Sequence, residues 1–341
     1  MALHHSDNTH GHHSPALSSH QCSNNSITLK RMPVKLELFS KAAISRGQNL
    51  NSILDNTESK QTVIPKLSLH LKNIKPDYKK VKLYAKVCGF KFEGQDLPIT
   101  YPHVLAFNLH LKLMTHKRFP LPVMGLVHIR NTITAHRSIL MNELLDLHVF
   151  IGESRVTNKG LEFDIHSKVS INKETAWESI TTNLYIIKKV ANKTIKTAKN
   201  TLRQYETQSS LRYHQQWSLP ENLGRKYARA SGDANPIHLH TLLAKAFGFK
   251  HAITHGMWLK AHTIASLDPI IKDKSAVTIS VEFKQPTPLN SEVRMNYQEK
   301  TKLISKPPNG SSSNETINFD IRSLDAHKLH MTGSITYPPT H

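Results

Sequence analysis

An aspartate and a histidine lie five positions apart in the stretch Ser231-Gly-Asp-Ala-Asn-Pro-Ile-His238. Asp233 and His238 could exchange protons near neutral pH and share one water molecule, which is what general acid/base catalysis requires. Asn235-Pro236 lies between them, and proline disfavours helical geometry in the residue before it. We therefore expect a bend that brings both side chains to one point, although the same residues are equally compatible with an Asx turn.

His255-Gly256-Met257 follows this stretch and predicts the start of a helix. Free backbone N–H groups at a helix N-terminus can stabilise negative charge that develops on a carbonyl oxygen. Taken alone, a glycine at this position more often marks the start of a helix and has no functional role. Beside the Asp/His pair it would complete a proton-transfer pair and an oxyanion donor, the minimum set for chemistry next to an activated carbonyl.

The chain is strongly basic. Its 341 residues include 45 Lys and Arg against 25 Asp and Glu, a formal net charge of +20. This balance favours a polyanionic partner such as nucleic acid, an anionic membrane surface, a phosphorylated cofactor or an acidic carrier protein, and does not choose among them. A surface that is merely rich in lysine is the alternative.

Cysteine usage and hydropathy exclude several classes of protein. Cys22 and Cys88 are the two cysteines of the sequence and form no CxxC pair, so neither a disulfide framework nor a zinc site is expected. No apolar run approaches the length of a membrane span, and the N-terminus lacks the apolar core of a secretory signal. We expect a cytoplasmic protein without stable membrane insertion.

The sequence divides into four segments. Residues 1–64 are predicted to be a mostly disordered, His-rich N-terminal extension, since they lack a strong apolar period; a metal-binding tract is the alternative. Residues 65–187 and 210–341 carry regular patterns and are predicted to be two domains. Residues 188–209 are predicted to be a basic linker. The extension contains His4, His5, His10, His12, His13 and His20.

The two patterned segments have the same element order, a helix followed by successive antiparallel strands. The apolar spacing predicts helices over 78–89 and 101–114 in the first segment, and over 220–230, 241–247 and 256–267 in the second. The strands are predicted over 67–71, 125–135, 144–151, 161–171, 177–188, 214–219, 277–283, 292–300, 316–322 and 330–337. This weak repeat predicts an α+β fold made of two copies of a central helix wrapped by a sheet.

The stretch from Tyr227 to Phe249, with His255-Gly256-Met257, closely resembles the MaoC-like, (R)-specific enoyl-CoA hydratase family, also called hydratase 2. The strand from Val277 to Phe283, followed by Lys284-Gln-Pro286, resembles the family's sheet after its central helix. Residues 101–131 resemble the N-terminal half of bacterial double-hot-dog members. The resemblance covers about residues 65–338 and implies a double hot-dog fold.

The resemblance implies a lyase that hydrates trans-2-enoyl thioesters or dehydrates (R)-3-hydroxyacyl thioesters in fatty acid metabolism. Asp233 and His238 would hold and activate the water, and the Gly256 N–H would bind the thioester oxygen. Asn235 would support the catalytic loop. The other supporting residues would be Ser231, Gly232 and His255.

Two departures from the family pattern limit this expectation. His240 stands where family members often have an acidic residue, and we expect it to be structural. The first half has no Asp-x-Asn-Pro-x-His string, so one active site per chain is expected, with a degenerate first half that shapes the acyl tunnel. The first half does contain a histidine, His103, which we expect to pack at the start of its helix.

No cofactor and no metal are expected, with the coenzyme A thioester acting as substrate. An acyl-CoA or acyl carrier protein thioester is the expected partner, attracted by basic candidates such as Arg130, Lys226, Arg229 and Lys284. No nucleic acid is expected, since no recognition motif is present. The chain is expected to be a monomer, a pseudo-dimer of its two halves, or a homodimer. The alternative function is a non-catalytic acyl-thioester-binding or dehydratase-complex subunit.

Overall fold

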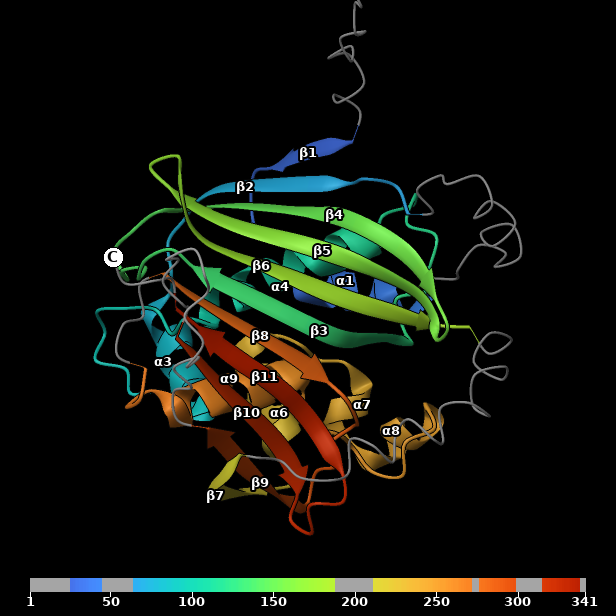
Figure 1. Cartoon of the computed structure of the whole chain (residues 1–341). Coiled ribbons are helices and arrows are strands. Elements are labelled where there is room, and N and C mark those ends of the chain that lie inside the picture. Colours follow the sequence, from blue (N-terminus) through green and yellow to red (C-terminus); the bar gives the residue numbers. More distant parts are fainter. Residues whose placement is uncertain (1–24, 45–63, 188–210, 272–275, 299–314, 338–341) are drawn as a thin grey trace, which may run out of the picture.

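The computed structural model describes residues 25–44, 64–187, 211–271, 276–298 and 315–337, and within them one large sheet carries the helices on its concave side (Figure 1). The helices are α1 (Lys35–Ile44), α3 (Tyr78–Cys88), α4 (Tyr101–Met114), α6 (Leu223–Ser231), α7 (Pro236–Leu239), α8 (Thr241–Ala246) and α9 (Gly256–Leu267). The strands are β1 (Ser26–Leu29), β2 (Ser68–Ile74), β3 (Leu126–Ala135), β4 (Leu145–Thr157), β5 (Gly160–Ile171), β6 (Glu174–Ile186), β7 (Arg212–Leu219), β8 (Val277–Phe283), β9 (Ser291–Gln298), β10 (Thr316–Ser323) and β11 (Leu329–Thr336).

The strand order shows that the two halves are related copies. The sheet runs β1-β2-β4-β5-β6-β3-β8-β11-β10-β9-β7. The first half contributes β2-β4-β5-β6-β3, and the second half contributes β7-β9-β10-β11-β8, which is the same order read from the opposite edge. The halves meet where β3 and β8 pair antiparallel, with Ile133 opposite Ile279. The repeat in the sequence predicted two copies of one motif, and the structure shows that these copies share a single sheet.

A central helix fills the concave side of each half. Helix α4 lies behind the first-half strands, and α9 lies within the curve of the second-half strands (Figure 1). Both helices carry apolar residues on most of their circumference, which is typical of buried helices. Leu109 and Leu113 of α4 and Ala261 and Ile264 of α9 are almost completely buried. The predicted helices over 101–114 and 256–267 are confirmed with these bounds.

Helix α3 links the two halves on the same side of the sheet. Its N-cap Asp77 accepts a hydrogen bond from the Lys80 N–H at 3.1 Å, and it ends at Gly89, whose φ of 85° lies in the left-handed region. Helix α3 contacts both α6 and α9. The Trp258 indole N–H of α9 donates to the Val87 carbonyl at 2.9 Å, so this first-half helix also supports the second half.

Residues 25–44 contain a strand and a helix that the sequence analysis did not predict. Strand β1 pairs parallel with β2, and α1 packs against α4, where Leu38 and Ala42 are almost fully buried. Both elements depend on these neighbours, since a four-residue strand has little stability of its own. The expected linker over 188–209, Cys22 and the N-terminal histidines lie outside the described residues.

A buried lysine ties α9 to the joint between the halves. Lys260 is completely buried, and its Nζ donates to the Asn131 carbonyl at 3.1 Å, the Asn131 Oδ1 at 2.6 Å and the Ile279 carbonyl at 3.0 Å. Asn131 lies on β3 and Ile279 on β8. Burial lowers the pKa of Lys260 well below its usual range, because taking an ammonium out of water disfavours its charged form.

The folded-state pKa of Lys260 predicts how stability depends on pH. Because that pKa lies below the unfolded value of about 10.4, the unfolded chain binds the extra proton between the two values, and stability rises with pH in this window. We expect wild type to gain stability relative to Lys260→Met as the pH rises toward about 10.4, for example between about pH 8.5 and about pH 9.5, by up to about 1.4 kcal/mol per pH unit.

Urea unfolding at both pH values measures this difference. Replacement of the exposed Lys79 by Met serves as the matched control and should leave the pH dependence of wild type unchanged. A free-energy difference between wild type and Lys260→Met that stays constant with pH would contradict the lowered pKa.

Candidate functional site

The stretch from Ser231 to His238 forms a tight connection between α6 and α7. Helix α6 ends at Gly232, whose φ of 86° is left-handed and whose N–H donates to the Ala228 carbonyl. Asn235 caps α7, with its side chain accepting from the Ile237 N–H, and Pro236 occupies the first helical position. The predicted bend is present, and it ends in a short helix that the sequence analysis did not predict.

The Asp233 carboxylate and the His238 imidazole converge at this connection. Asp233 Oδ1 accepts from the Asn235 N–H at 3.1 Å, and the Asp233 N–H donates to Ser231 Oγ at 3.1 Å. His238 Nδ1 lies 2.8 Å from the Ile253 carbonyl. A carbonyl only accepts, so Nδ1 carries the proton and the neutral ring leaves its Nε2 lone pair free.

His255 contacts both Asp233 and His238. Its ring stacks on that of His238 with centroids 3.8 Å apart, and its Nε2 donates to the Asp233 carbonyl at 3.0 Å. One ligand-type atom from each of Asp233, His238 and His255 falls within 4.8 Å of the others, a spacing that could hold a metal ion. The Nδ1 of His255 is buried, and its Nε2 is hydrogen-bonded, so a metal would have to displace part of this arrangement.

Burial moves the pKa values of the pair toward each other. Desolvation raises the pKa of Asp233 and lowers the pKa of His238, while the charges of the two groups partly offset both shifts. The pKa of His255 lies well below its usual range because of burial and the neighbouring His238. Because the charge of each group shifts the pKa of the other, the two groups titrate as a coupled pair.

Gly256 begins α9 directly after His255, and the side chain of His255 makes no capping hydrogen bond. The backbone N–H groups of the first helical turn have no intrahelical acceptor. A Cβ at Gly256 would lie 2.9 Å from Cε1 of Phe283, so only glycine leaves both the N–H and the ring in place. The helix start is therefore suited to accept a carbonyl oxygen.

These residues line one end of a cavity of about 260 Å³ that extends into the first half. Asp233 keeps 26 % of its side chain exposed, whereas His255 keeps 2 %. From the second half the wall includes Asn235, Ile237, His238, Phe249, Ile253, Gly256, Phe283 and Lys284. From the first half it includes Phe39, His103, Phe107, His110, Leu111, Met114, His128 and Asn183.

Most of the site residues predicted from sequence lie together. Asp233, Asn235, His238, His255 and Gly256 all line the cavity. Ser231 and Gly232 position the backbone of Asp233. His240 caps α8 by accepting from the Leu242 N–H at 3.3 Å, which is a structural contact.

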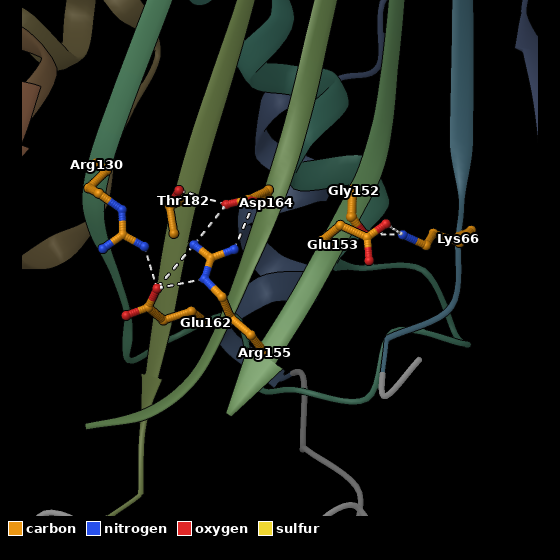
Figure 2. Close-up of polar contacts among 8 residues, drawn as sticks. All are labelled: Lys66, Arg130, Gly152, Glu153, Arg155, Glu162, Asp164 and Thr182. Carbon is orange, nitrogen blue, oxygen red and sulfur yellow. Dashed lines mark hydrogen bonds and ion pairs between the residues drawn. The ribbon is translucent and has the colours of Figure 1, made fainter. Parts of the chain in front are cut away.

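The four basic candidates differ in their surroundings. Arg130 lies on the face of the sheet turned away from α4, where it pairs with Glu162, which also bonds Arg155 (Figure 2). Arg130 does not line the cavity, and its charge is already paired with a carboxylate. Lys284 does line the cavity, and its Nζ lies 2.7 Å from a Glu282 carboxylate oxygen. Lys226 and Arg229 are exposed on α6, the helix that leads into the stretch from Ser231 to His238.

The sequence analysis missed the polar residues of the first-half wall. His103 is buried in the first turn of α4, as expected for a helix start, yet it also faces other histidines in the cavity wall. His110 and His128 were passed over because each stands alone among apolar neighbours. The seven-residue spacing of His103 and His110 on a helix places them on one face, and this signal could have found the pair.

No helix among the described residues is long and apolar enough to cross a membrane. Within the same part of the chain Cys88 is a free, buried thiol, and burial raises its pKa. It is the last residue of α3, packs in the core and does not line the cavity.

Comparisons with known proteins agree with this geometry. A family model described as the MaoC like domain matches residues 192–318. The 3-hydroxyacyl-thioester dehydratase X of Mycobacterium tuberculosis is 31 % identical over 224 residues, which cover 65 % of this chain and 77 % of that protein. The crystal structure of HtdX from the same organism superposes with a TM-score of 0.63 at 25 % identity, covering 79 % of this chain and 98 % of that one.

A MaoC-like dehydratase from Phytophthora capsici shares the architecture at lower identity. Its structure superposes with a TM-score of 0.56 at 14 % identity and covers 86 % of this chain and 100 % of its own. At this identity the likeness concerns the fold alone. It agrees with the double hot dog expected from the sequence.

The contact between Gly256 and Phe283 generates a stability prediction. We expect Gly256→Ala to destabilise the protein by about 1–3 kcal/mol, because the added methyl overpacks the ring. Phe283→Leu in the same chain should recover part of this loss, and urea unfolding of the two single variants and the double variant measures the coupling. A Gly256→Ala variant as stable as wild type would show that the ring moves without cost.

Proposed function

The chain belongs to the family of MaoC-like dehydratases, and on that premise we propose that it is an (R)-specific hydro-lyase acting on acyl thioesters. It would add water to trans-2-enoyl thioesters or remove it from (R)-3-hydroxyacyl thioesters, in fatty acid metabolism. The observation that carries the proposal is the convergence of Asp233, His238 and the free start of α9 at Gly256 on one end of a cavity. This set can activate water beside a thioester carbonyl.

His238 is the proposed base. Its Nδ1–H is held by the Ile253 carbonyl, so the free Nε2 can accept a proton from water. As that O–H bond breaks, the hydroxyl adds to C3 of the enoyl group, and the resulting imidazolium returns the proton to C2. Asp233, held as an acceptor by the Asn235 N–H, would orient the water and stabilise the imidazolium. Water and proton then add to one face.

The thioester oxygen would lie against the N-terminus of α9. Negative charge grows on this oxygen when the hydroxyl adds, and the Gly256 N–H and the helix dipole stabilise it. The oxygen needs an open approach to the backbone, and the missing side chain at Gly256 provides it. The proposed reaction uses no cofactor, since proton transfer and oxyanion stabilisation come from the chain itself.

The thioester carrier is proposed to be coenzyme A or acyl carrier protein, both of which are anionic. Lys226 and Arg229 are exposed on α6, and Lys284 lies at the cavity wall. These cations would attract either carrier. The Asp-x-Asn-Pro-x-His string occurs once, so we propose one active site per chain.

Substitution of the proposed acid/base pair tests this function. We expect Asp233→Asn and His238→Ala each to lower kcat for a trans-2-enoyl-CoA by about 10²–10⁴-fold, the usual contribution of a positioned acid or base. Loss of the enoyl absorbance measures turnover, and thermal melting checks the fold. His251→Ala, an exposed histidine outside the cavity, is the matched control. Undiminished activity in either site variant would contradict the proposed function. Binding without turnover by wild type would favour the non-catalytic alternative.

The pH dependence of turnover follows from the two shifted pKa values. The reactive form needs a neutral His238 and an ionised Asp233, so kcat/KM should fall as pH decreases. Burial lowers the pKa of His238, which puts the midpoint of this loss below the ordinary histidine value of about 6.5. In Asp233→Asn the imidazole, followed by NMR, should titrate lower still, because the carboxylate raises its pKa. A midpoint above neutral pH contradicts this account.

A further inference from the structure

The first-half wall of the cavity contains a patch of polar side chains among mostly apolar residues. His103 and His110 of α4, His128 of β3 and Asn183 of β6 all line it. The exposed fractions are 5 % for His103, 3 % for His110 and 8 % for Asn183. Buried polar side chains are costly unless they find hydrogen-bond partners, so their presence here calls for a physical account.

The four side chains form one cluster. The His103 ring centroid lies 5.3 Å from that of His110 and 6.2 Å from that of His128. His128 and Asn183 are directly opposite in the pairing of β3 with β6, so they share a face of the sheet. The register of β3 shifts between His128 and Arg130, a bulge of the kind that re-aims a side chain near an active site.

The ring of Phe283 separates the cluster from Gly256 at the proposed catalytic end of the cavity. The Phe283 centroid is 5.0 Å from that of His128, and the same ring lies against Gly256. An acyl chain whose thioester oxygen is held at Gly256 would therefore pass Phe283 and reach the histidines. Apolar residues of α4, namely Phe107, Leu111 and Met114, continue the wall beyond them.

The cluster keeps unused hydrogen-bonding capacity. His110 Nε2 bonds Ser167 Oγ at 2.7 Å, and His128 Nε2 donates to the Arg130 carbonyl at 3.0 Å, which leaves one ring nitrogen of each unused. His103 Nδ1 and Asn183 Nδ2 are buried without a partner among the described residues. Buried groups of this kind usually bond protein or ordered water, so a ligand with oxygen atoms would satisfy them.

The histidines are neutral at physiological pH. Burial lowers the pKa of His110 to about 3 and of His128 to about 4, and it lowers that of His103 well below its usual range. The nearby Lys260 lowers the pKa of His103 and His128 further. A neutral imidazole offers one donor and one acceptor, which suits a hydroxyl or keto group rather than a carboxylate.

We propose that His103, His128 and Asn183, backed by His110, form a specificity subsite for an oxygen function on the acyl chain of the substrate. The preferred substrates are then acyl thioesters that carry a hydroxyl or keto group beyond the two reacting carbons. This inference rests on the proposed function, because it assumes that the thioester is bound at Gly256.

The test compares trans-2-enoyl-CoA chains of equal length, one unsubstituted and others with a hydroxyl or keto group at successive carbons. Wild type should give a kcat/KM about tenfold higher for at least one oxygenated chain, the effect of a buried hydrogen bond that the plain chain leaves unmade. His103→Leu and Asn183→Leu should lose this preference and accept the plain chain at least as well as wild type. Neither substitution removes a hydrogen bond among the described residues, so both variants should fold, which thermal melting checks.

Asn108→Leu is the matched control. Asn108 is also a buried amide with an unpartnered oxygen, and it lies on α4 outside the cavity wall, so its substitution should keep the preference. Turnover of all chains without a preference, or a preference that survives His103→Leu and Asn183→Leu, overturns the subsite and leaves the proposed function intact. Turnover of no chain overturns the proposed function and the inference with it.

Discussion

The architecture depends on one buried lysine at the joint between the halves. The Lys260 Nζ bonds two oxygens of Asn131 on β3 and the Ile279 carbonyl on β8. The Asn131 Nδ2 in turn donates to Ser179 and Thr181 on β6. The network thus spans α9 and three strands from both halves. Gly256 lies one helical turn before Lys260 on α9, so the contact that fixes the joint also fixes the helix start beside Asp233 and His238.

The two halves share a topology, and each contributes different residues to the cavity. The second half carries the loop from Ser231 to His238, which is held by short-range hydrogen bonds and by the Ile253 carbonyl. The first half has no such loop, and its α4 turns histidines toward the same cavity. The joined sheet places Asp233 and His238 at one end of that cavity and the proposed chain-binding groups next to them, across the ring of Phe283.

The surroundings of the basic residues differ with their position in the fold. On the outer face of the first-half sheet, Arg130 and Arg155 are paired with Glu162 and Asp164 (Figure 2). Such pairs contribute little stability individually and leave these arginines less available to an anionic partner. The exposed cations of α6 are different, because they lie on the helix that leads into the loop from Ser231 to His238. The net charge of +20 thus did not indicate which basic residues lie near this loop.

The sequence by itself determined what depends on near neighbours. Apolar spacing set the helices over 101–114 and 256–267, and the Gly-Asp-x-Asn-Pro string set the bend between Asp233 and His238, since caps and turns are made within a few residues. Only the tertiary structure decided that β3 joins β8, that Lys260 is buried there, that Arg130 faces outward, and that His103, His128 and Asn183 meet. These contacts join residues distant in the chain, and local periodicity carries no information about such pairs.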